Sequence, residues 1–221
     1  MRILMFTKYP APGRVKTRLA RSIGPEHAAG LQAAFIRDEL EMLGTLDASV
    51  TLCCDPLAPL SAYRALFGLE HSYAVQQGAD LGERMLNALH AALKENAERV
   101  VLIGSDLPDL PALHISQAFT ALETASLCLG PAPDGGFYLL GLRQPLPHGI
   151  FEAVPWGSGE VLTRTLANCE TNGLHPQLIA PWPDVDTLPD LLGYARRNRH
   201  GLTHSMEYIR AHELAADAWK R

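Results

Sequence analysis

The chain has 221 residues, of which 47% are hydrophobic and 19% charged, and its formal net charge at pH 7 is −5. This length and apolar content predict a single domain, residues 1–221, with a sizeable core, and exclude a largely disordered chain. The acidic balance argues against a nucleic-acid partner or a polybasic membrane patch, and no apolar stretch reaches the roughly 18 residues of a membrane span.

The four cysteines, Cys53, Cys54, Cys128 and Cys169, show no CxxC or zinc-binding spacing. They are typical of reduced core thiols, so we expect a cytoplasmic protein. The apolar run at residues 2–7 is too short for a signal peptide and has no small-residue cleavage site. It predicts a first strand instead.

Strands and helices are predicted in alternation along the chain. In the first half we expect strands at residues 2–7, 49–54, 72–75 and 99–104, and helices at residues 15–21, 24–44, 61–67 and 80–97. In the second half we expect strands at residues 126–130, 137–142 and 176–180, and helices at residues 111–124, 159–171, 189–196 and 203–219. The alternation predicts an α/β fold whose mostly parallel sheet is covered by helices on both faces.

A basic loop follows the first predicted strand and leads into a helix. Arg14, Lys16 and Arg18 bring three cations into five residues, and Gly13 allows close backbone approach. A helix N-terminus with nearby cations suits phosphate. The spacing is not that of a Walker A loop, and the alternative interpretation is a solvated basic turn.

Carboxylates follow two later elements. Asp106 comes directly after the buried run at residues 99–104, so it should lie at the carboxyl edge of the sheet, where α/β proteins bind ligands. A carboxylate there is a natural ligand for Mg²⁺ between phosphates, whereas Asp109 fits a helix cap or a turn. Asp186 would be a second metal ligand, although Asp186-Thr187 before a helix also fits simple N-capping.

Two further segments are ambiguous by themselves. Asp134-Gly-Gly is a common hairpin turn, but it follows a predicted central strand. Asp80 is placed to cap a helix, and Arg84 lies one turn into it, facing either a nucleotide or Glu83 and Asp80. Trp156-Gly157-Ser158 could form an aromatic lid over a substrate or an ordinary approach to the next helix.

Together these segments resemble the rSAM/selenodomain-associated transferase family (DUF2064), which is of glycosyltransferase-A type. That family is related to the guanylyltransferases of molybdenum-cofactor and deazaflavin-cofactor synthesis. The matching residues are Thr7-Lys8 with Pro10-x-Pro12-Gly13-x-x-Lys16-Thr17-Arg18-Leu19, Gly78-x-Asp80-Leu-Gly-Glu-Arg84, Gly104-Ser105-Asp106-x-Pro108, Gly130-Pro-x-x-Asp134-Gly-Gly136-Phe-Tyr138 and Asp184-Val-Asp186-Thr. The chain departs from the family at Trp156-Gly157-Ser158, where Trp-Ser-Thr is frequent.

The resemblance implies a three-layer α/β/α sandwich of the nucleotide-diphospho-sugar transferase fold, with a mixed, mainly parallel sheet. It also implies a site that holds a nucleotide diphosphate and Mg²⁺ or Mn²⁺. The residues expected to bind the nucleotide and its phosphates are Lys8, Pro12, Gly13, Arg14, Lys16, Thr17, Arg18, Asp80, Arg84 and Ser105. The expected metal ligands are Asp106 and Asp186, and the expected catalytic residues are Lys16, Arg18, Asp106 and Asp134.

Three functions remain open on the sequence. The first is glycosyl transfer from a nucleotide sugar to a small acceptor, with Asp134 binding or deprotonating the acceptor hydroxyl. The second is nucleotidyl transfer from a nucleoside triphosphate to a phosphorylated small molecule, with release of pyrophosphate. The third is a nucleotide-binding subunit without turnover.

Overall fold

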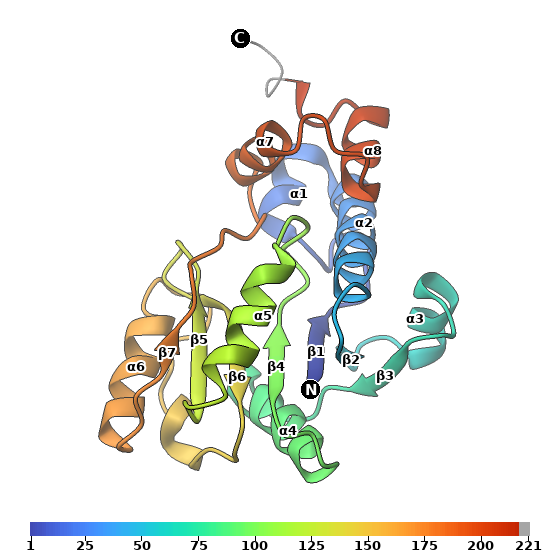
Figure 1. The fold of residues 1–221 in the computed structure, drawn as a ribbon. Coiled ribbons are helices and arrows are strands. Elements are labelled where there is room, and N and C mark those ends of the chain that lie inside the picture. The colour runs from blue at the N-terminus through green and yellow to red at the C-terminus, as the bar shows by residue number, and fades with distance from the viewer. Residues whose placement is uncertain (217–221) are drawn as a thin grey trace.

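The computed structural model describes residues 1–216, and within them seven strands form one sheet in the order β3–β2–β1–β4–β6–β5–β7 (Figure 1). The strands are β1 Arg2–Thr7, β2 Ser49–Cys54, β3 Ser72–Val75, β4 Val100–Ile103, β5 Leu127–Pro131, β6 Phe137–Leu142 and β7 Gln177–Leu178. The helices are α1 Thr17–Ile23, α2 Pro25–Leu43, α3 Leu60–Phe67, α4 Leu81–Lys94, α5 Ala112–Ala121, the 3₁₀ turn η1 His148–Phe151, α6 Val161–Thr171, α7 Leu188–Arg197 and α8 His204–Ala211.

The sheet is mixed and mainly parallel, as predicted. β1, β2, β3 and β4 run parallel to their neighbours in this group, and β7 runs parallel to β5. β6 is antiparallel to both β4 and β5, and the short Asp134-Gly-Gly turn joins it to β5. Because β1, β2 and β4 all end at one edge, the loops that follow them meet there.

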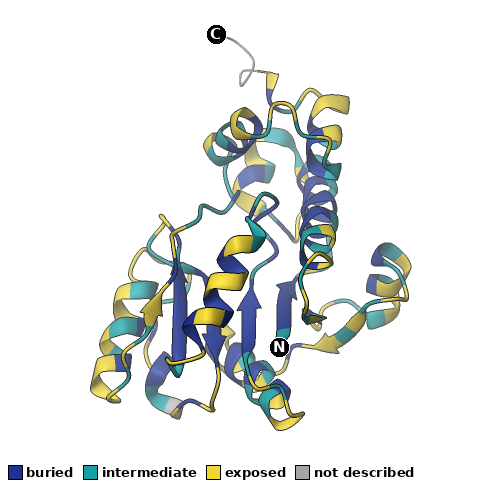
Figure 2. Cartoon of the chain, viewed as in Figure 1, coloured by how far each residue is buried: buried dark blue, intermediate teal, exposed yellow. Residues whose placement is uncertain are grey.

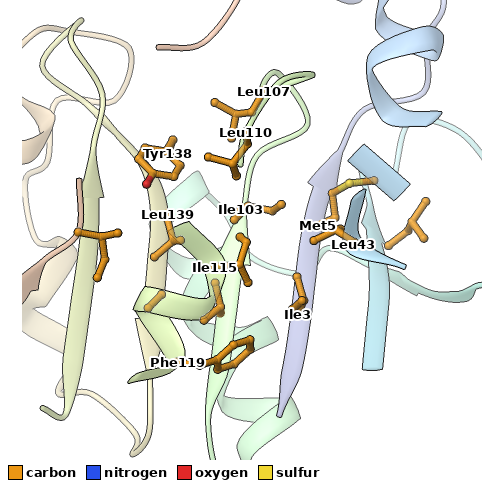
Figure 3. Close-up of a cluster of buried hydrophobic side chains, with 14 of the residues drawn as sticks. Ile3, Met5, Leu43, Ile103, Leu107, Leu110, Ile115, Phe119, Tyr138 and Leu139 are labelled. Atoms are coloured by element: carbon orange, nitrogen blue, oxygen red, sulfur yellow. The ribbon is translucent and has the colours of Figure 1, made fainter. Parts of the chain in front are cut away.

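Alternating side chains of the central strands fill two cores, one on each face of the sheet. On one face, Ile3 and Met5 of β1 lie in a cluster with Ile115 and Phe119 of α5 (Figure 3). On the other face, Leu4 and Phe6 of β1 lie in a second cluster with side chains of α4, η1 and α6. The central strands are buried and the outer helix faces are exposed (Figure 2), so the three-layer sandwich is confirmed.

A third cluster lies beyond the sheet, where α1, α7 and α8 gather around one end of α2 (Figure 1). Its buried side chains include Leu19, Phe35, Tyr194 and Met206. This cluster holds the segment after β1 against the segment before α7. Two stretches of chain that are about 170 residues apart in sequence therefore meet at the edge where β1 and β4 end.

Within the described residues the predicted element ends are right to within three residues, with one exception. The last predicted helix, residues 203–219, ends at Ala211, and the part of it beyond residue 216 lies outside the described residues. Among the other elements, one of the largest displacements is that of the predicted helix at residues 80–97, which ends three residues early at Lys94, because Asn96 adopts a left-handed backbone (φ 65°). No helix of the described residues is long and apolar enough to cross a membrane.

Candidate active site

A cleft of about 680 Å³ opens at the edge where β1, β2 and β4 end. Three strand ends contribute to its lining: Thr7 and Lys8 at the end of β1, Asp55 after β2, and Ser105 and Asp106 after β4. The remaining lining residues come from the basic loop, from the start of α4 and from the segment before α7; they are Arg14, Val15, Lys16, Thr17, Arg18, Ala79, Asp80, Leu81, Arg84 and Asp186, with Phe6, Gln32, Gln76 and Gly104 beneath.

The basic loop is held open by an unusual backbone at Lys16. Gly13 has a φ of +75°, and Lys16 itself is left-handed at φ 48° and ψ 42°. A left-handed residue other than glycine costs roughly 1–2 kcal/mol, and such residues gather at functional sites. The helix predicted from residue 15 therefore begins at Thr17, after the turn at Lys16.

Lys16 brings the two predicted metal ligands together. Its Nζ lies 2.6 Å from Asp106 Oδ1 and 3.1 Å from Asp186 Oδ1, and it donates to the carbonyl of Val185 at 2.7 Å. Only 2% of the Lys16 side chain is exposed, whereas 40% of Asp106 faces solvent. Arg18 adds a second cation, with its Nη2 2.6 Å from Asp186 Oδ2.

This charge pattern moves two pKa values in the direction that keeps the ion pair. Burial would lower the pKa of Lys16, but the carboxylates of Asp106 and Asp186 more than offset it and leave that pKa raised. Burial would likewise raise the pKa of Asp186, but Lys16 and Arg18 hold it below its ordinary value. Both partners are therefore charged at neutral pH.

Asp184 is a third carboxyl group near this ion pair, and its pKa shifts in the opposite direction to that of Asp186. Burial, and then the neighbouring carboxylates of Asp186 and Asp134, raise its pKa to about 6. The single buried ammonium of Lys16 does not compensate every carboxylate in this group. A further cation would be favoured here by the same charge balance.

Two side chains of α2 that sequence analysis missed fix the loop carrying Asp106. Gln32 Nε2 donates to the carbonyl of Ser105 at 2.8 Å, and Glu39 Oε1 accepts from the backbone N–H of Leu107 at 2.8 Å. Both side chains are buried. In a helical pattern Gln32 and Glu39 look like ordinary polar positions, and only the tertiary fold brings them beneath the loop.

The segment carrying Asp186 is fixed by the cap of α7. Thr187 and Asp190 form a reciprocal capping box, and the N–H of Val185 donates to the carbonyl of Asp106 at 3.0 Å. Thr187, not Asp186, is thus the capping residue. Asp109 lies in the turn before α5, whose N-cap is Pro111, and it accepts hydrogen bonds from Arg197 and Asn198 at the end of α7. Of the two roles predicted for Asp109, the turn is confirmed and the helix cap is wrong.

Polar side chains line the opposite end of the cleft, and two of them, Asp55 and Gln76, are buried. Asp80 caps α4 by accepting from Glu83 N at 2.8 Å. Arg84 lines the cleft and pairs with Asp55 at 3.3 Å. The sequence left open whether Arg84 faces a nucleotide or pairs with Asp80 or Glu83. Gln76 donates to the carbonyl of Cys53 at 2.8 Å. Asp55 and Gln76 were missed because each follows a strand with no motif around it.

A second cavity of about 240 Å³ adjoins the cleft and shares Phe6, Leu81 and Gly104 with it. Its other lining residues are Met85, Leu102, Asp134, Gly136, Phe137, Tyr138, Leu140, Trp156, Gly157, Ser158 and Val161. Asp134 thus lies at the second cavity, away from the cleft that contains Lys16. The turn function also predicted for Asp134 is met, since its Oδ1 accepts from the N–H of Gly136 at 2.9 Å.

Comparison with known proteins decides the family. The sequence profile of DUF2064, described as "Uncharacterized protein conserved in bacteria", matches residues 39–158. A crystal structure from Desulfovibrio desulfuricans G20, provisionally named a nucleotide-diphospho-sugar transferase, has a TM-score of 0.92 at 35% sequence identity, covering 98% of this chain and 97% of that one. The chain belongs to the DUF2064 family.

The other comparisons add the fold alone. The Mycobacterium sp. strain JC1 homologue of Rv0371c from Mycobacterium tuberculosis has a TM-score of 0.51 at 15% identity, covering 95% of this chain and 98% of that one. No curated protein matches the sequence. The predicted nucleotide-diphospho-sugar transferase fold is confirmed, and it places this DUF2064 protein among enzymes of the transferase class.

The structure brings most of the predicted site of this DUF2064 protein into one cleft. Lys8, Arg14, Lys16, Thr17, Arg18, Asp80, Arg84, Ser105, Asp106 and Asp186 all line it. Pro12 and Gly13 are exposed in the loop that leads to Lys16 and are not among the lining residues.

The implied divalent cation can be tested against the donor atoms. Within residues 1–216, no group of three or more His, Cys, Asp or Glu side chains converges as a metal site. Asp106 and Asp186 nevertheless converge on one cation, the ammonium of Lys16. Mg²⁺ commonly takes one or two carboxylates and completes its shell with water and phosphate. The donor set therefore fits such an ion once Lys16 gives up its place between the carboxylates.

Proposed function

We propose that this protein is a glycosyltransferase that moves a sugar from a nucleoside-diphosphate sugar to a small acceptor without a phosphate group. The observation that carries the proposal is the contrast in charge between the two adjoining cavities. Five cations line the cleft: Lys8, Arg14, Lys16, Arg18 and Arg84. Among the described residues that line the second cavity, none is Lys, Arg or His.

The cleft suits the diphosphate of the donor. Lys16 and Arg18 are held in place by Asp106 and Asp186, so they are oriented before any ligand binds. Once the donor is bound, such cations stabilise the negative charge that grows on a departing diphosphate. Lys8 and Arg14, which are exposed at the rim, would attract the anionic donor.

Asp106 and Asp186 would hold Mg²⁺ or Mn²⁺, which would neutralise charge on the diphosphate leaving group. For that, Lys16 would shift from the carboxylates to a phosphate oxygen. A lysine side chain can make such a shift because it carries its ammonium on a long, flexible stem.

The second cavity suits the acceptor. In the transfer, the acceptor oxygen forms a bond to the anomeric carbon while the bond from that carbon to the diphosphate oxygen breaks. The acceptor proton passes to the carboxylate of Asp134, and the nucleoside diphosphate leaves. Asp134 is the carboxylate that lines the second cavity, which supports this role as general base.

Nucleotidyl transfer is the competing reaction, and the lining of the second cavity disfavours it. There the attacking group is a phosphate, which binds where cations or free N–H groups surround it. An apolar cavity beside the single carboxylate of Asp134 would repel a phosphate.

The test is a melting-temperature panel of UDP-, GDP- and CDP-sugars and the four ribonucleoside triphosphates, each with and without Mg²⁺. A nucleotide sugar at ten times its Kd should raise Tm by about 4 °C, since binding to the native state stabilises it by about 1.4 kcal/mol. Product analysis with the stabilising ligand should then find nucleoside diphosphate. Release of pyrophosphate from a triphosphate would instead establish nucleotidyl transfer.

Asp106→Asn tests the metal ligand. This variant should bind the donor with the same weak affinity with and without Mg²⁺, because a neutral amide replaces one of the two carboxylate ligands. Asp109→Asn is the matched control, since Asp109 lies three residues on, outside the cleft lining, and should keep the metal dependence. Metal-dependent binding that persists in Asp106→Asn would refute the assigned role.

A further inference from the structure

The second cavity is built almost wholly of apolar side chains. Leu102 of β4 and Leu140 of β6 are buried in the sheet beneath it, and Met85 of α4 and Val161 of α6 are buried beside it. Such a surface binds apolar groups by releasing water and offers a polyol few hydrogen-bond partners.

An aromatic wall closes one side of this cavity, and it is fixed in place. The ring of Trp156 lies edge-on to Phe151 and to Phe137, with ring centroids 5.5 Å and 6.3 Å apart. Phe137 stacks on Phe151 with ring centroids 6.2 Å apart. Gly82 of α4 permits this packing, since a Cβ there would come within 2.9 Å of Trp156 Cζ2. Trp156 is therefore a preformed wall of the cavity. The sequence had left open whether this segment forms a lid over a substrate or an ordinary approach to the next helix.

Two glycine turns set the mouth of the cavity. A Cβ on Gly135 would lie 2.0 Å from the carbonyl oxygen of Gly159, so the two backbones touch. The N–H of Leu162 donates to the carbonyl of Gly135 at 2.9 Å. Of the two carboxylate oxygens of Asp134, Oδ1 accepts a hydrogen bond from the N–H of Gly136, and Oδ2 accepts none from residues 1–216. Oδ2 is therefore available to a ligand at this mouth.

We infer that the acceptor carries an apolar ring, aromatic or saturated, with a hydroxyl group that faces Asp134. The ring lies against Trp156 and Phe137, and its hydroxyl donates to the Asp134 carboxylate. The shared residues Phe6, Leu81 and Gly104 connect this position to the cleft. The use of the ring compound as an acceptor rests on the proposed glycosyl transfer, but its binding does not.

The experiment measures binding of four probes to the whole protein by saturation-transfer NMR titration. Phenol and cyclohexanol present an apolar ring with one hydroxyl, glycerol presents hydroxyls without a ring, and phenyl phosphate adds charge. We expect phenol and cyclohexanol to bind at least fivefold more tightly than glycerol or phenyl phosphate. Equal binding of glycerol or phenyl phosphate would overturn the inference.

Two variants locate the probes. Trp156→Ala should weaken phenol at least fivefold, because it removes the aromatic face. Gly104→Leu should weaken phenol similarly by filling the junction of the cavities, where a Cβ at Gly104 meets no atom within 4 Å. Trp182→Phe, outside the lining of both cavities, should leave phenol affinity unchanged. Unchanged phenol affinity in Trp156→Ala and Gly104→Leu would refute the site.

Binding of UDP and GDP with Mg²⁺ to the same proteins separates this inference from the proposed function. If phenol binding depends on Trp156 while neither nucleotide binds, the ring site stands and the donor chemistry falls. If a nucleotide binds and phenol does not, the ring site is overturned and the donor chemistry stands.

Discussion

Lys16 is the residue on which the cleft depends. Its left-handed backbone carries strain, and its ammonium is almost wholly removed from water. Removing one partner of a buried ion pair costs more than the pair contributes, because the charges left behind lose their compensation. At this site the residual charges would be those of Asp106 and Asp186, of which only Asp186 keeps a cation, Arg18.

Lys16→Met should therefore weaken nucleoside-diphosphate binding at least tenfold and lower the free energy of unfolding by about 1 kcal/mol, a small cost since Asp106 is 40% exposed and water screens it. Calorimetric titration and denaturant unfolding measure the two effects. Lys94→Met removes the same charge at the exposed end of α4 and should change neither. Wild-type affinity in Lys16→Met would show that Lys16 is a structural residue only.

At the scale of single residues, the sequence predicts those whose position follows from a strand end or a motif. Lys16, Asp106 and Asp186 all lie at the expected cleft, because carboxyl ends of parallel strands share an edge. Gln32 and Glu39 could not be predicted. Their partners, Ser105 and Leu107, are about 70 residues away along the chain, and no local pattern encodes such a contact.

At the scale of elements, the start of α4 shapes both cavities. Asp80 caps the helix, Leu81 lines both cavities, and Gly82 admits the wall of Trp156. One end of one helix thus sets the distance between the two proposed ligands.

Gly82→Ala should lower Tm by about 5 °C, although alanine normally favours a helix, because its Cβ would lie 2.8 Å from Phe151 Cβ and 2.9 Å from Trp156 Cζ2. Phenol affinity should fall with it as Trp156 shifts. Gly193→Ala in α7 is the matched control, since its Cβ would meet only the flexible end of Arg197 at 3.6 Å, and it should raise Tm slightly. A stabilised Gly82→Ala protein would mean that Trp156 is not packed against α4.

The strands were the most predictable elements. β1, β2, β3 and β6 begin and end where predicted. In β1, β2 and β6 side chains on both faces contribute to a core, whereas the edge strand β3 contributes Tyr73. Helix ends failed where a residue leaves the helical region, as at Lys16 and Asn96, and nothing in a hydrophobic period marks such a residue.

For the whole molecule, α2 joins the sheet to the helices beyond it. Ile36 and Leu43 pack on the sheet, and Leu31 and Phe35 pack in the cluster of α7 and α8. Asp38 binds the start of α8 through the N–H groups of His204 and Ser205. The polar side of α2 is thus buried between two layers, which explains why the stability of the whole chain should respond to its carboxyl groups.

Glu39 makes this response measurable. It is 1% exposed, and within the described residues its Oε2 has no hydrogen-bond partner. Burial, with a smaller effect of Asp106, raises its pKa well above the ordinary value. Because the folded pKa exceeds the unfolded one, the stability that Glu39 contributes is fully present below the unfolded pKa and is lost as pH rises through the folded pKa.

Glu39→Gln keeps an oxygen for the N–H of Leu107 and removes the ionisation. Its Tm should match that of the wild type near pH 5 and exceed it by about 3 °C near pH 8. At pH 8 the wild-type Glu39 must either be buried in its charged form or stay protonated far above the pKa it has in the unfolded chain. Circular dichroism melts from pH 5 to pH 8 measure the difference. Glu26→Gln, at the exposed start of α2, should run parallel to the wild type. If Glu39→Gln also runs parallel, Glu39 is not the group that couples the stability of the fold to pH.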